Sequence, residues 1–320
     1  MIPPRIALAF ALGLGLACGS LGPVQAQAIG QWEELAIDGV EAFQLGDYDL
    51  AAERFGRALA AARDYGATDQ RITNSLINLA RTFRMQRRLA EAEPLYREVI
   101  ARQEAAHGID DPDLALSLEA LGGIYAAQAQ WAAAEPVLRR ALRILERTVG
   151  SEHPYTAVVV ADLGDVALGT DRNVEAVGLF ARVVAIRTKY YGADHRSLAA
   201  PLTREGIALR ALKRHDDARE VFIEAWAIWQ HESALPGEVT LTLRNLIEVE
   251  RQTGHYEAAA QHGRELIAHR ADEVGPDTLE FAAELDDFAR TLQLAGDPSQ
   301  AQAMADWAAA IRAAGGVRGP

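Results

Sequence analysis

Three histidines, His255, His262 and His269, stand seven residues apart and come nearest in this chain to a metal-binding pattern. Imidazole nitrogens bind zinc at about 2.1 Å. Seven residues along a helix rise about 10.5 Å, so these rings cannot share one ion without other ligands. A hydrolase using these histidines with acids such as Asp272 and Glu273 is the competing hypothesis. We favour a structural role and expect no metal ion and no other cofactor.

Other signatures of catalysis are missing from the sequence. There is no G-x-S-x-G, no Walker A loop, no H-E-x-x-H, and no G-x-G-x-x-G placed between a strand and a helix. Carboxylates are abundant, but none forms an isolated pair in an apolar surround. The sequence therefore predicts no catalytic residue, and we expect a protein that is not an enzyme.

The elements that position these side chains are revealed by an alanine that recurs every 41 or 42 residues. Its seven positions are Ala51, Ala92, Ala134, Ala176, Ala218, Ala259 and Ala301. A period of this length indicates one helical unit copied along the chain, with each copy stacked on its neighbours. Stacked units present surfaces for partners more often than they enclose reaction chambers.

The residues around each repeated alanine also recur. A small residue usually stands twelve positions earlier, as at Gly164, and a large apolar one four positions later, as at Phe180. Two packed antiparallel helices need this pattern, because small side chains let the helix axes approach and a large one fills the space beside them. Gly263 and Ala305 depart from it, since each replaces the large residue.

The unit boundaries complete the fold prediction. Gly108, Gly150 and Gly192 are 42 residues apart, where a glycine past the last helical turn supplies a left-handed cap. No segment shows the period-two alternation of a strand. We predict an all-α fold, a right-handed superhelical solenoid of about seven antiparallel helix pairs over residues 31–316, followed by a disordered tail at 317–320.

This pattern resembles the tetratricopeptide repeat (TPR), in the 42-residue variety of the kinesin light chain. The resemblance is strongest in residues 88–112 and 121–154, and residues 71–196 match in three consecutive units without gaps. It implies a TPR-like solenoid and a protein that binds other proteins. The family is defined by its scaffold, so the resemblance implies no particular partner.

In the TPR family the first helix of each unit lines a concave groove, and some members hold a C-terminal carboxylate there with basic and amide side chains. Eight such side chains on first helices are our candidate partner-binding residues: Asn78, Arg81, Arg84, Arg204, Arg210, Arg244, Asn245 and Arg251. Arginine suits this role because its planar fork gives one carboxylate two hydrogen bonds.

A second interpretation of these arginines competes with the first, and we favour it. The arginines pair with acids on adjacent helices or are simply solvated. Asp162 and Asp165, in an intervening unit, would weaken a continuous basic groove.

The start of the chain has the features of a secretory signal peptide. One positive charge at Arg5 precedes an apolar run at 6–18 and an A-x-A-like site, so we predict a leader at 1–28, cleaved after Ala26 or Ala28. The apolar run is short for a membrane span. We expect export to the bacterial periplasm or secretion. A lipoprotein is the alternative, because residues 16–20 resemble a box in which Cys18 is acylated.

Net charge limits the classes of partner that the protein can bind, and cysteine usage limits disulfides and metal sites. The formal net charge is −13 over 320 residues, and removal of the leader takes away one positive charge, Arg5, and leaves −14. An acidic surface disfavours nucleic acid and anionic membranes. Cys18 is the only cysteine, so the mature form would hold no disulfide and no thiolate metal site.

Taken together, these features predict an exported scaffold or adaptor that is not an enzyme. We expect it to hold a protein or peptide segment, with acidic or C-terminal carboxylate groups, in a concave groove. A lipid-anchored assembly factor for an envelope complex is the alternative.

Overall fold

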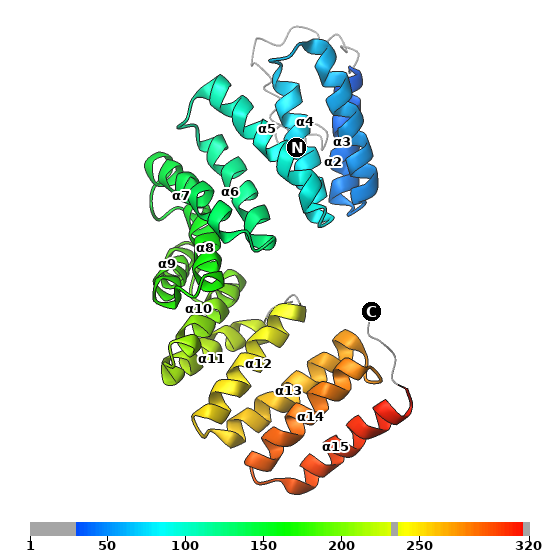
Figure 1. The fold of residues 1–320 in the computed structure, drawn as a ribbon, viewed down its shortest axis with the longest axis vertical. Coiled ribbons are helices and arrows are strands. Elements are labelled where there is room, and N and C mark those ends of the chain that lie inside the picture. Colours follow the sequence, from blue (N-terminus) through cyan, green and yellow to red (C-terminus); the bar gives the residue numbers. More distant parts are fainter. Residues whose placement is uncertain (1–29, 232–235, 316–320) are drawn as a thin grey trace. The chain divides into compact units, whose positions relative to one another are not determined.

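A computed structural model describes residues 30–231 and 236–315 of the chain, and these residues are almost entirely helical (Figure 1). In this part of the chain there are fourteen α-helices, two short 3₁₀ helices and no strand, which confirms the predicted all-α fold. The predicted leader at 1–28, Cys18 and the predicted tail at 317–320 lie outside the described residues.

The chain divides into two compact units, unit 1 (Met1–Ser151) and unit 2 (Glu152–Pro320). Unit 1 contains α2 (Gln31–Gln44), α3 (Tyr48–Ala62), α4 (Gln70–Met85), α5 (Leu89–His107), α6 (Pro112–Ala127) and α7 (Trp131–Thr148). A 3₁₀ helix, η1 (Arg63–Tyr65), follows α3.

Unit 2 follows the same plan. It contains α8 (Pro154–Gly169), α9 (Asn173–Tyr191), α10 (Ala199–Ala211), α11 (His215–His231), α12 (Pro236–Gln252), α13 (Tyr256–Val274), α14 (Leu279–Leu294) and α15 (Pro298–Ala313). A 3₁₀ helix, η2 (Arg196–Leu198), precedes α10.

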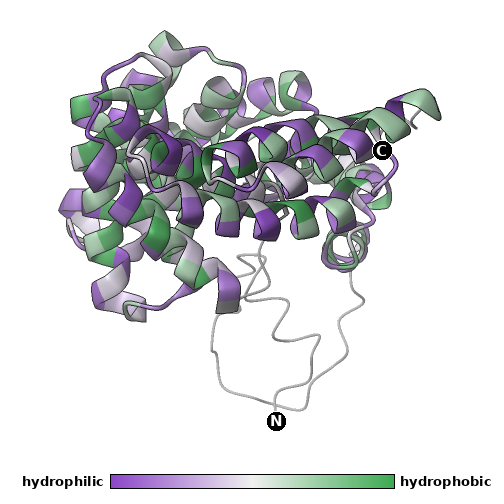
Figure 2. Cartoon of the chain, turned by 90° about the horizontal axis from the view of Figure 1, so that it is seen from below, coloured by the Kyte–Doolittle hydropathy of each residue, from purple (hydrophilic) through white to green (hydrophobic). Residues whose placement is uncertain are grey.

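Consecutive helices pack as hairpins, starting with α2 against α3 and ending with α14 against α15. The described helices therefore form seven pairs, as predicted. Hydrophobic and hydrophilic residues alternate around the helices, which is the pattern expected when one face of each helix is buried (Figure 2). None of the helices in the described ranges combines the length and apolar character that crossing a membrane requires.

The repeated alanines are all buried, and none is more than 2% exposed. A Cβ atom added to Gly164 would lie 2.7 Å from the ring of Phe180, and one added to Gly206 would lie 2.6 Å from the ring of Phe222. Any side chain at these glycines would displace the facing ring. The small and large residues of the repeat are therefore complementary surfaces of one helix pair.

In the pair α12–α13 the small and large residues are exchanged between the two helices. Ile247 takes the place of the small residue on the first helix, and Gly263 takes the place of the large residue on the second. A Cβ atom on Gly263 would lie 2.5 Å from the ring of Phe288, which belongs to α14 of the next pair. The space at Gly263 is thus filled by Phe288 of the neighbouring helix pair.

The turn inside each pair contains one residue with a positive φ. Glycine holds this position in three pairs, and in the other four it is held by Arg87, Ala129, Asp171 and Lys213, with φ between 56° and 61°. Left-handed backbone is strained for residues that carry a Cβ atom. Between pairs, Gly108, Gly150 and Gly192 also have positive φ, as the sequence predicts.

Candidate partner-binding site

In unit 2, three of the four candidate arginines are engaged with acids on neighbouring first helices. Arg204 of α10 donates to Glu238 of α12 at 3.1 Å, and its Nε lies 3.5 Å from Asp165 of α8. One guanidinium therefore bridges three successive first helices. Arg244 of α12 forms an ion pair with Glu284 of α14, whose side chain is 9% exposed.

The other candidates on α12 also form hydrogen bonds or ion pairs within the chain. Arg251 donates to Asp287 at 3.0 Å and to Thr291 at 3.2 Å, both on α14, and it pairs with Glu248 on its own helix. Burial lowers the pKa of Arg251, but its hydrogen bonds to Glu248 and Asp287 outweigh burial and raise this pKa overall. The Asn245 amide donates to the carbonyl of Leu241 at 2.8 Å.

Arg210 of α10 differs from these residues. Its side chain is half-buried, and its Nε has no hydrogen-bond partner among the described residues. In unit 2, four of the five candidate residues are therefore satisfied within the fold. The interpretation that the arginines pair with acids on adjacent helices describes Arg204, Arg244 and Arg251.

In unit 1, the three candidates on α4 retain hydrogen-bonding capacity. Asn78, Arg81 and Arg84 follow one another at helical spacing along one side of α4. Arg81 is exposed, and its guanidinium carbon lies 4.8 Å from the centre of the Phe43 ring of α2. Arg84 reaches Glu119 of α6 only at 3.8 Å. Asn78 is half-buried, and its backbone carbonyl accepts a hydrogen bond from the Thr82 hydroxyl.

We call these five residues, Phe43, Asn78, Arg81, Arg84 and Glu119, the α4 donor face. Burial raises the pKa of the Tyr96 hydroxyl on α5; the positive charges of Arg84 and Arg81 oppose that shift, and the negative charge of Glu119 adds to it. Leu116, one turn before Glu119 on α6, is 43% exposed. The α4 donor face thus combines the exposed guanidinium of Arg81, and that of Arg84 at 3.8 Å from Glu119, with the ring of Phe43, and Leu116 adds exposed apolar surface on α6.

The heptad histidines lie in three separate environments. His255 precedes α13 and its Nδ1 lies 2.8 Å from the hydroxyl of Thr253. The Nδ1 of His262 lies 2.8 Å from Glu250. His269 is two turns further along α13. No cluster of three or more histidine, cysteine or carboxylate side chains suited to a metal ion occurs in the described ranges.

A buried charged triad in unit 2 escaped the sequence analysis. Glu250 of α12 is fully buried, and it contacts His262 of α13 and the Nε of Arg219 of α11 at 3.3 Å. Leu209 and Leu292 occupy the register of Glu250 in the adjacent pairs. A comparison of aligned units would have revealed this charge in a core position.

Glu205 of α10 is a second acid at a core register, where Leu163 and Leu246 stand in the pairs on either side. Burial, assisted by the charge of Glu224 on α11, raises the pKa of Glu205 to about 7, although Arg214 opposes this shift. Glu205 therefore titrates close to neutral pH.

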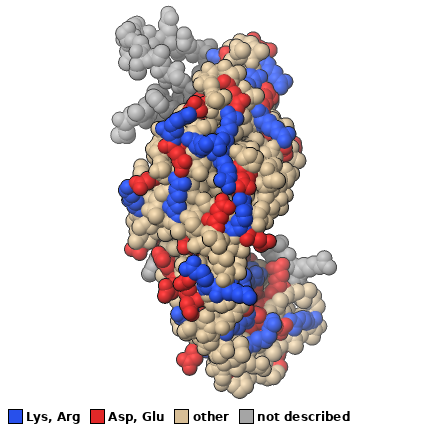
Figure 3. Space-filling view, turned by 60° about the vertical axis from the view of Figure 1, so that its left-hand side comes forward, with Lys and Arg blue, Asp and Glu red and all other residues tan. Residues whose placement is uncertain are grey.

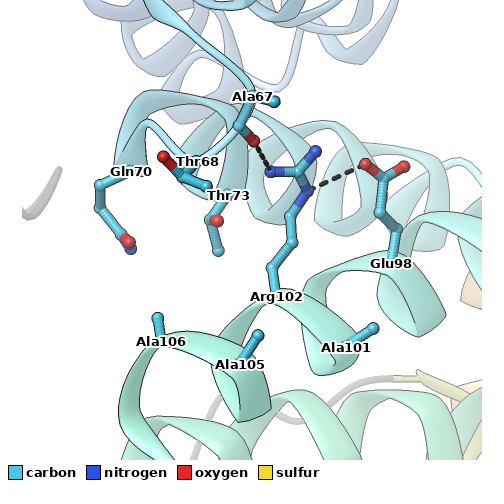
Figure 4. Close-up of a pocket in the computed structure, with 9 residues that line it drawn as sticks. All are labelled: Ala67, Thr68, Gln70, Thr73, Glu98, Ala101, Arg102, Ala105 and Ala106. Atoms are coloured by element: carbon cyan, nitrogen blue, oxygen red, sulfur yellow. Dashed lines mark hydrogen bonds and ion pairs between the residues drawn. The ribbon is translucent and has the colours of Figure 1, made fainter.

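A hollow of about 580 Å³ in unit 1 lies between α5 and the segment that leads into α4 (Figure 4). Methyl groups of Ala101, Ala105 and Ala106 line one side. Arg102 crosses the hollow and is tied to Glu98 at 2.9 Å and to the Ala67 carbonyl at 2.8 Å. Its one charged donor is therefore already paired, and the uncharged polar side chains that line the hollow are Thr68, Gln70 and Thr73.

Charges of both signs are interspersed over the surface shown in Figure 3, as the many ion pairs predict. Lys189 of α9, for example, pairs with Glu152. A surface of this kind is well solvated and attracts no single class of charged ligand over its whole extent. Selectivity for a charged ligand would then depend on local groups.

A set of helical hairpins that repeats every 41 or 42 residues defines a helical repeat protein. The sequence profile described as "Tetratricopeptide repeat" matches residues 40–105, 72–147, 113–188 and 155–231, more than half of the chain. The chain therefore belongs to the tetratricopeptide repeat family. No curated protein sequence matches it significantly.

Solved structures support the same fold. The nearly identical TPR-like repeats of a proposed kinesin light chain from Podosopora anserina are 24% identical, with a TM-score of 0.55 over 64% of this chain and 98% of that one. BtubC (BKLC) from P. vanneervenii is 19% identical, with a TM-score of 0.50 over 89% of this chain and 90% of that one.

The apo form of RapI gives a TM-score of 0.62 at 14% identity, over 88% of this chain and 85% of that one. The predicted tetratricopeptide repeat is confirmed, and a proposed kinesin light chain is among the solved structures that share the fold. Identities this low establish the fold alone, while the family itself indicates a scaffold for protein–protein interaction.

Proposed function

We propose that this protein is an exported adaptor, without enzymatic activity, that holds an acidic segment of a partner protein against the α4 donor face. The observation that carries this proposal is the contrast between the two units. Arg204, Arg244 and Arg251 are neutralised by acids of the same chain, whereas Arg81 keeps its guanidinium exposed beside an aromatic ring.

The chemistry of the α4 donor face defines the segment. Arg81 and Arg84 supply cationic donors that suit a carboxylate, either an acidic side chain or a free C-terminus. The Asn78 amide offers both a donor and an acceptor to a peptide backbone. Phe43 and Leu116 provide apolar surface, so the segment should carry an apolar side chain next to its carboxylate.

Recovery of the partner from native envelope extract tests this proposal, with Arg81→Glu compared against Arg143→Glu. Arg143 is an exposed arginine on α7, the second helix of its pair in the same unit, so both variants make the same charge change. We expect the protein recovered by the wild type to be lost with Arg81→Glu and kept with Arg143→Glu. Equal recovery by the two variants would show that the α4 donor face does not bind the partner.

The carboxylate is tested on a peptide that corresponds to the bound segment of the recovered partner. Fluorescence anisotropy should show about tenfold weaker binding when the carboxylate is amidated, because a charge-assisted bidentate contact is lost. Unchanged affinity would restrict the contact to the apolar surface.

Export rests on the leader and is tested separately. Mass spectrometry of the mature N-terminus distinguishes a free residue 27 or 29, as we propose, from an acylated Cys18, which would make the protein a lipid-anchored assembly factor. A mature protein that begins at Met1 would refute both forms of export.

A further inference from the structure

A groove in unit 2 is lined by residues of α14 and α15. These two helices form the last helix pair of the described residues (Figure 1). Its volume is about 420 Å³. Ala289, Ala301 and Ala305 form part of its floor, and Asp286, Arg290 and Gln293 form its α14 side. The groove has apolar floor and polar rim, the usual composition of a protein interface.

The preceding helix pair shows what such a groove accepts. In α12–α13, Ala259 and Gly263 stand in the register of Ala301 and Ala305. There, α14 covers them, and Phe288 lies so close to Gly263 that an added Cβ atom would be 2.5 Å from the ring. The α14–α15 groove is therefore a continuation of an interface already formed inside the same unit.

The small residues extend along α15. Ile267, which packs with Phe288 in the preceding pair, corresponds to Ala309, and Ala309 is exposed. Ala305 and Ala309 thus leave room for a docked helix to carry larger side chains than those that α14 packs against α13. A helix that docks here can place an aromatic residue over Ala305 with little rearrangement.

The rim differs in charge from the preceding interface. Arg244, which pairs with Glu284 of α14, corresponds to Asp286 in the α14–α15 groove. Asp286 pairs with Arg312, and both side chains remain at least 40% exposed. A docking helix should therefore carry a basic residue where α14 carries Glu284.

A second copy of the chain does not supply such a helix. The outward side of α2 consists of polar, exposed residues, Gln31, Glu34, Asp38 and Glu41. Asp38 occupies the register of Phe288, so head-to-tail stacking would place a carboxylate over Ala305 and acids beside Asp286. Burial of the Asp38 carboxylate over the apolar Ala305 is unfavourable.

We propose that the α14–α15 groove binds an amphipathic α-helix of a partner protein, with an aromatic side chain seated on Ala305 and a basic side chain facing Asp286. The site is separate from the α4 donor face and does not depend on it. A protein with both surfaces would hold two partners, or two segments of one partner.

The probe is a fluorescein-labelled peptide with the sequence of residues 279–294 and the substitution Glu284→Lys. We expect its anisotropy to rise on addition of the full-length mature protein. A peptide that also carries Phe288→Ala should bind at least about tenfold more weakly, as expected for loss of an aromatic anchor. The peptide that keeps Glu284 should bind about threefold to tenfold more weakly, because its carboxylate faces Asp286.

Two variants of the protein localise the binding. Ala305→Phe fills the hollow and should weaken binding at least about tenfold. Ala303→Phe is the matched control, because Ala303 is exposed and so is Gln261, its counterpart in the preceding pair, although that pair is covered by α14. The control should bind within about twofold of the wild type. Circular dichroism establishes that both variants are folded.

Several results would overturn the proposal. They are the absence of binding at peptide concentrations up to about 1 mM, equal binding by wild type and Ala305→Phe, and equal binding by the Phe288→Ala peptide. Concentration-dependent self-association of the wild type, abolished by Ala305→Phe, would instead assign the groove to a second copy. Loss of binding with Arg81→Glu would show that the peptide contacts the α4 donor face.

Discussion

Replacing the buried triad of Arg219, Glu250 and His262 with apolar residues tests whether the attraction between these groups stabilises the fold or only offsets the cost of burying them. Glu250 is fully buried, and the side chains of Arg219 and His262 are 27% and 15% exposed. The alanine variant of Arg219 leaves a buried carboxylate with only an imidazole partner. Removal of one partner from such a pair costs about 3 kcal/mol of the free energy of unfolding.

Substitution of Glu250 alone should be less harmful. Glu250→Leu places an apolar side chain in a core position that Leu209 and Leu292 fill in other pairs. Arg219 can turn toward water, and His262 loses one hydrogen bond. We expect a loss of about 1–2 kcal/mol, the cost of an unmet buried polar group.

The combined variant Arg219→Ala, Glu250→Leu, His262→Val copies residue types found at the same registers elsewhere in the chain, as at Ala260 and Val221. We expect its stability to equal or exceed that of the wild type, because desolvation of buried charges offsets most of their attraction. Urea unfolding followed by circular dichroism measures the stabilities. Repeat arrays need not unfold in two states, so a global unfolding curve can mix several transitions. Hydrogen–deuterium exchange in α12 therefore measures the local stability around the triad in each variant.

Two results would refute this reasoning. If the combined variant is destabilised as much as Arg219→Ala, the triad contributes net stabilisation and its hydrogen bonds exceed their desolvation cost. If Arg219→Ala is harmless, the buried carboxylate does not depend on the guanidinium.

Three further predictions concern the stability of individual pairs. Between pH 4.5 and 7 the folded state holds a proton on Glu205 that the unfolded chain releases, so stability falls as pH rises through this range. Allowing for solvent screening, Glu205→Gln should remove about 1–2 kcal/mol of this dependence in urea titrations at pH 5 and pH 8; identical pH slopes would contradict it. Ala129→Gly relieves a positive φ of 56° and should raise the unfolding free energy by about 0.5–1 kcal/mol, and a lower midpoint would refute the strain. Gly164→Ala should lower it by about 1–3 kcal/mol, because the new Cβ atom would lie 2.7 Å from Phe180, and thermal unfolding at an unchanged midpoint would show that the ring moves freely.

The sequence by itself determined the helix pairs, their number and their closest contacts. The repeated alanine and its fixed neighbours, such as Gly206 and Phe222, encode packing between residues that are close along the chain. Helical periodicity and side-chain size decide such contacts, and both can be read from residue types alone. The same local logic predicted the positive φ of Gly108 and Gly150 at the ends of their helices.

Only the tertiary structure decided which charged groups remain available. Arg84 and Arg251 occupy the same position of the repeat, yet Arg251 meets Asp287, thirty-six residues away, at 3.0 Å, while Arg84 reaches Glu119 only at 3.8 Å. Whether two such groups meet depends on how one helix pair is rotated on the next, and long side chains can reach several alternatives. The uncovered floor at Ala305 likewise follows from stacking, because the same small residue is buried wherever another helix lies over it.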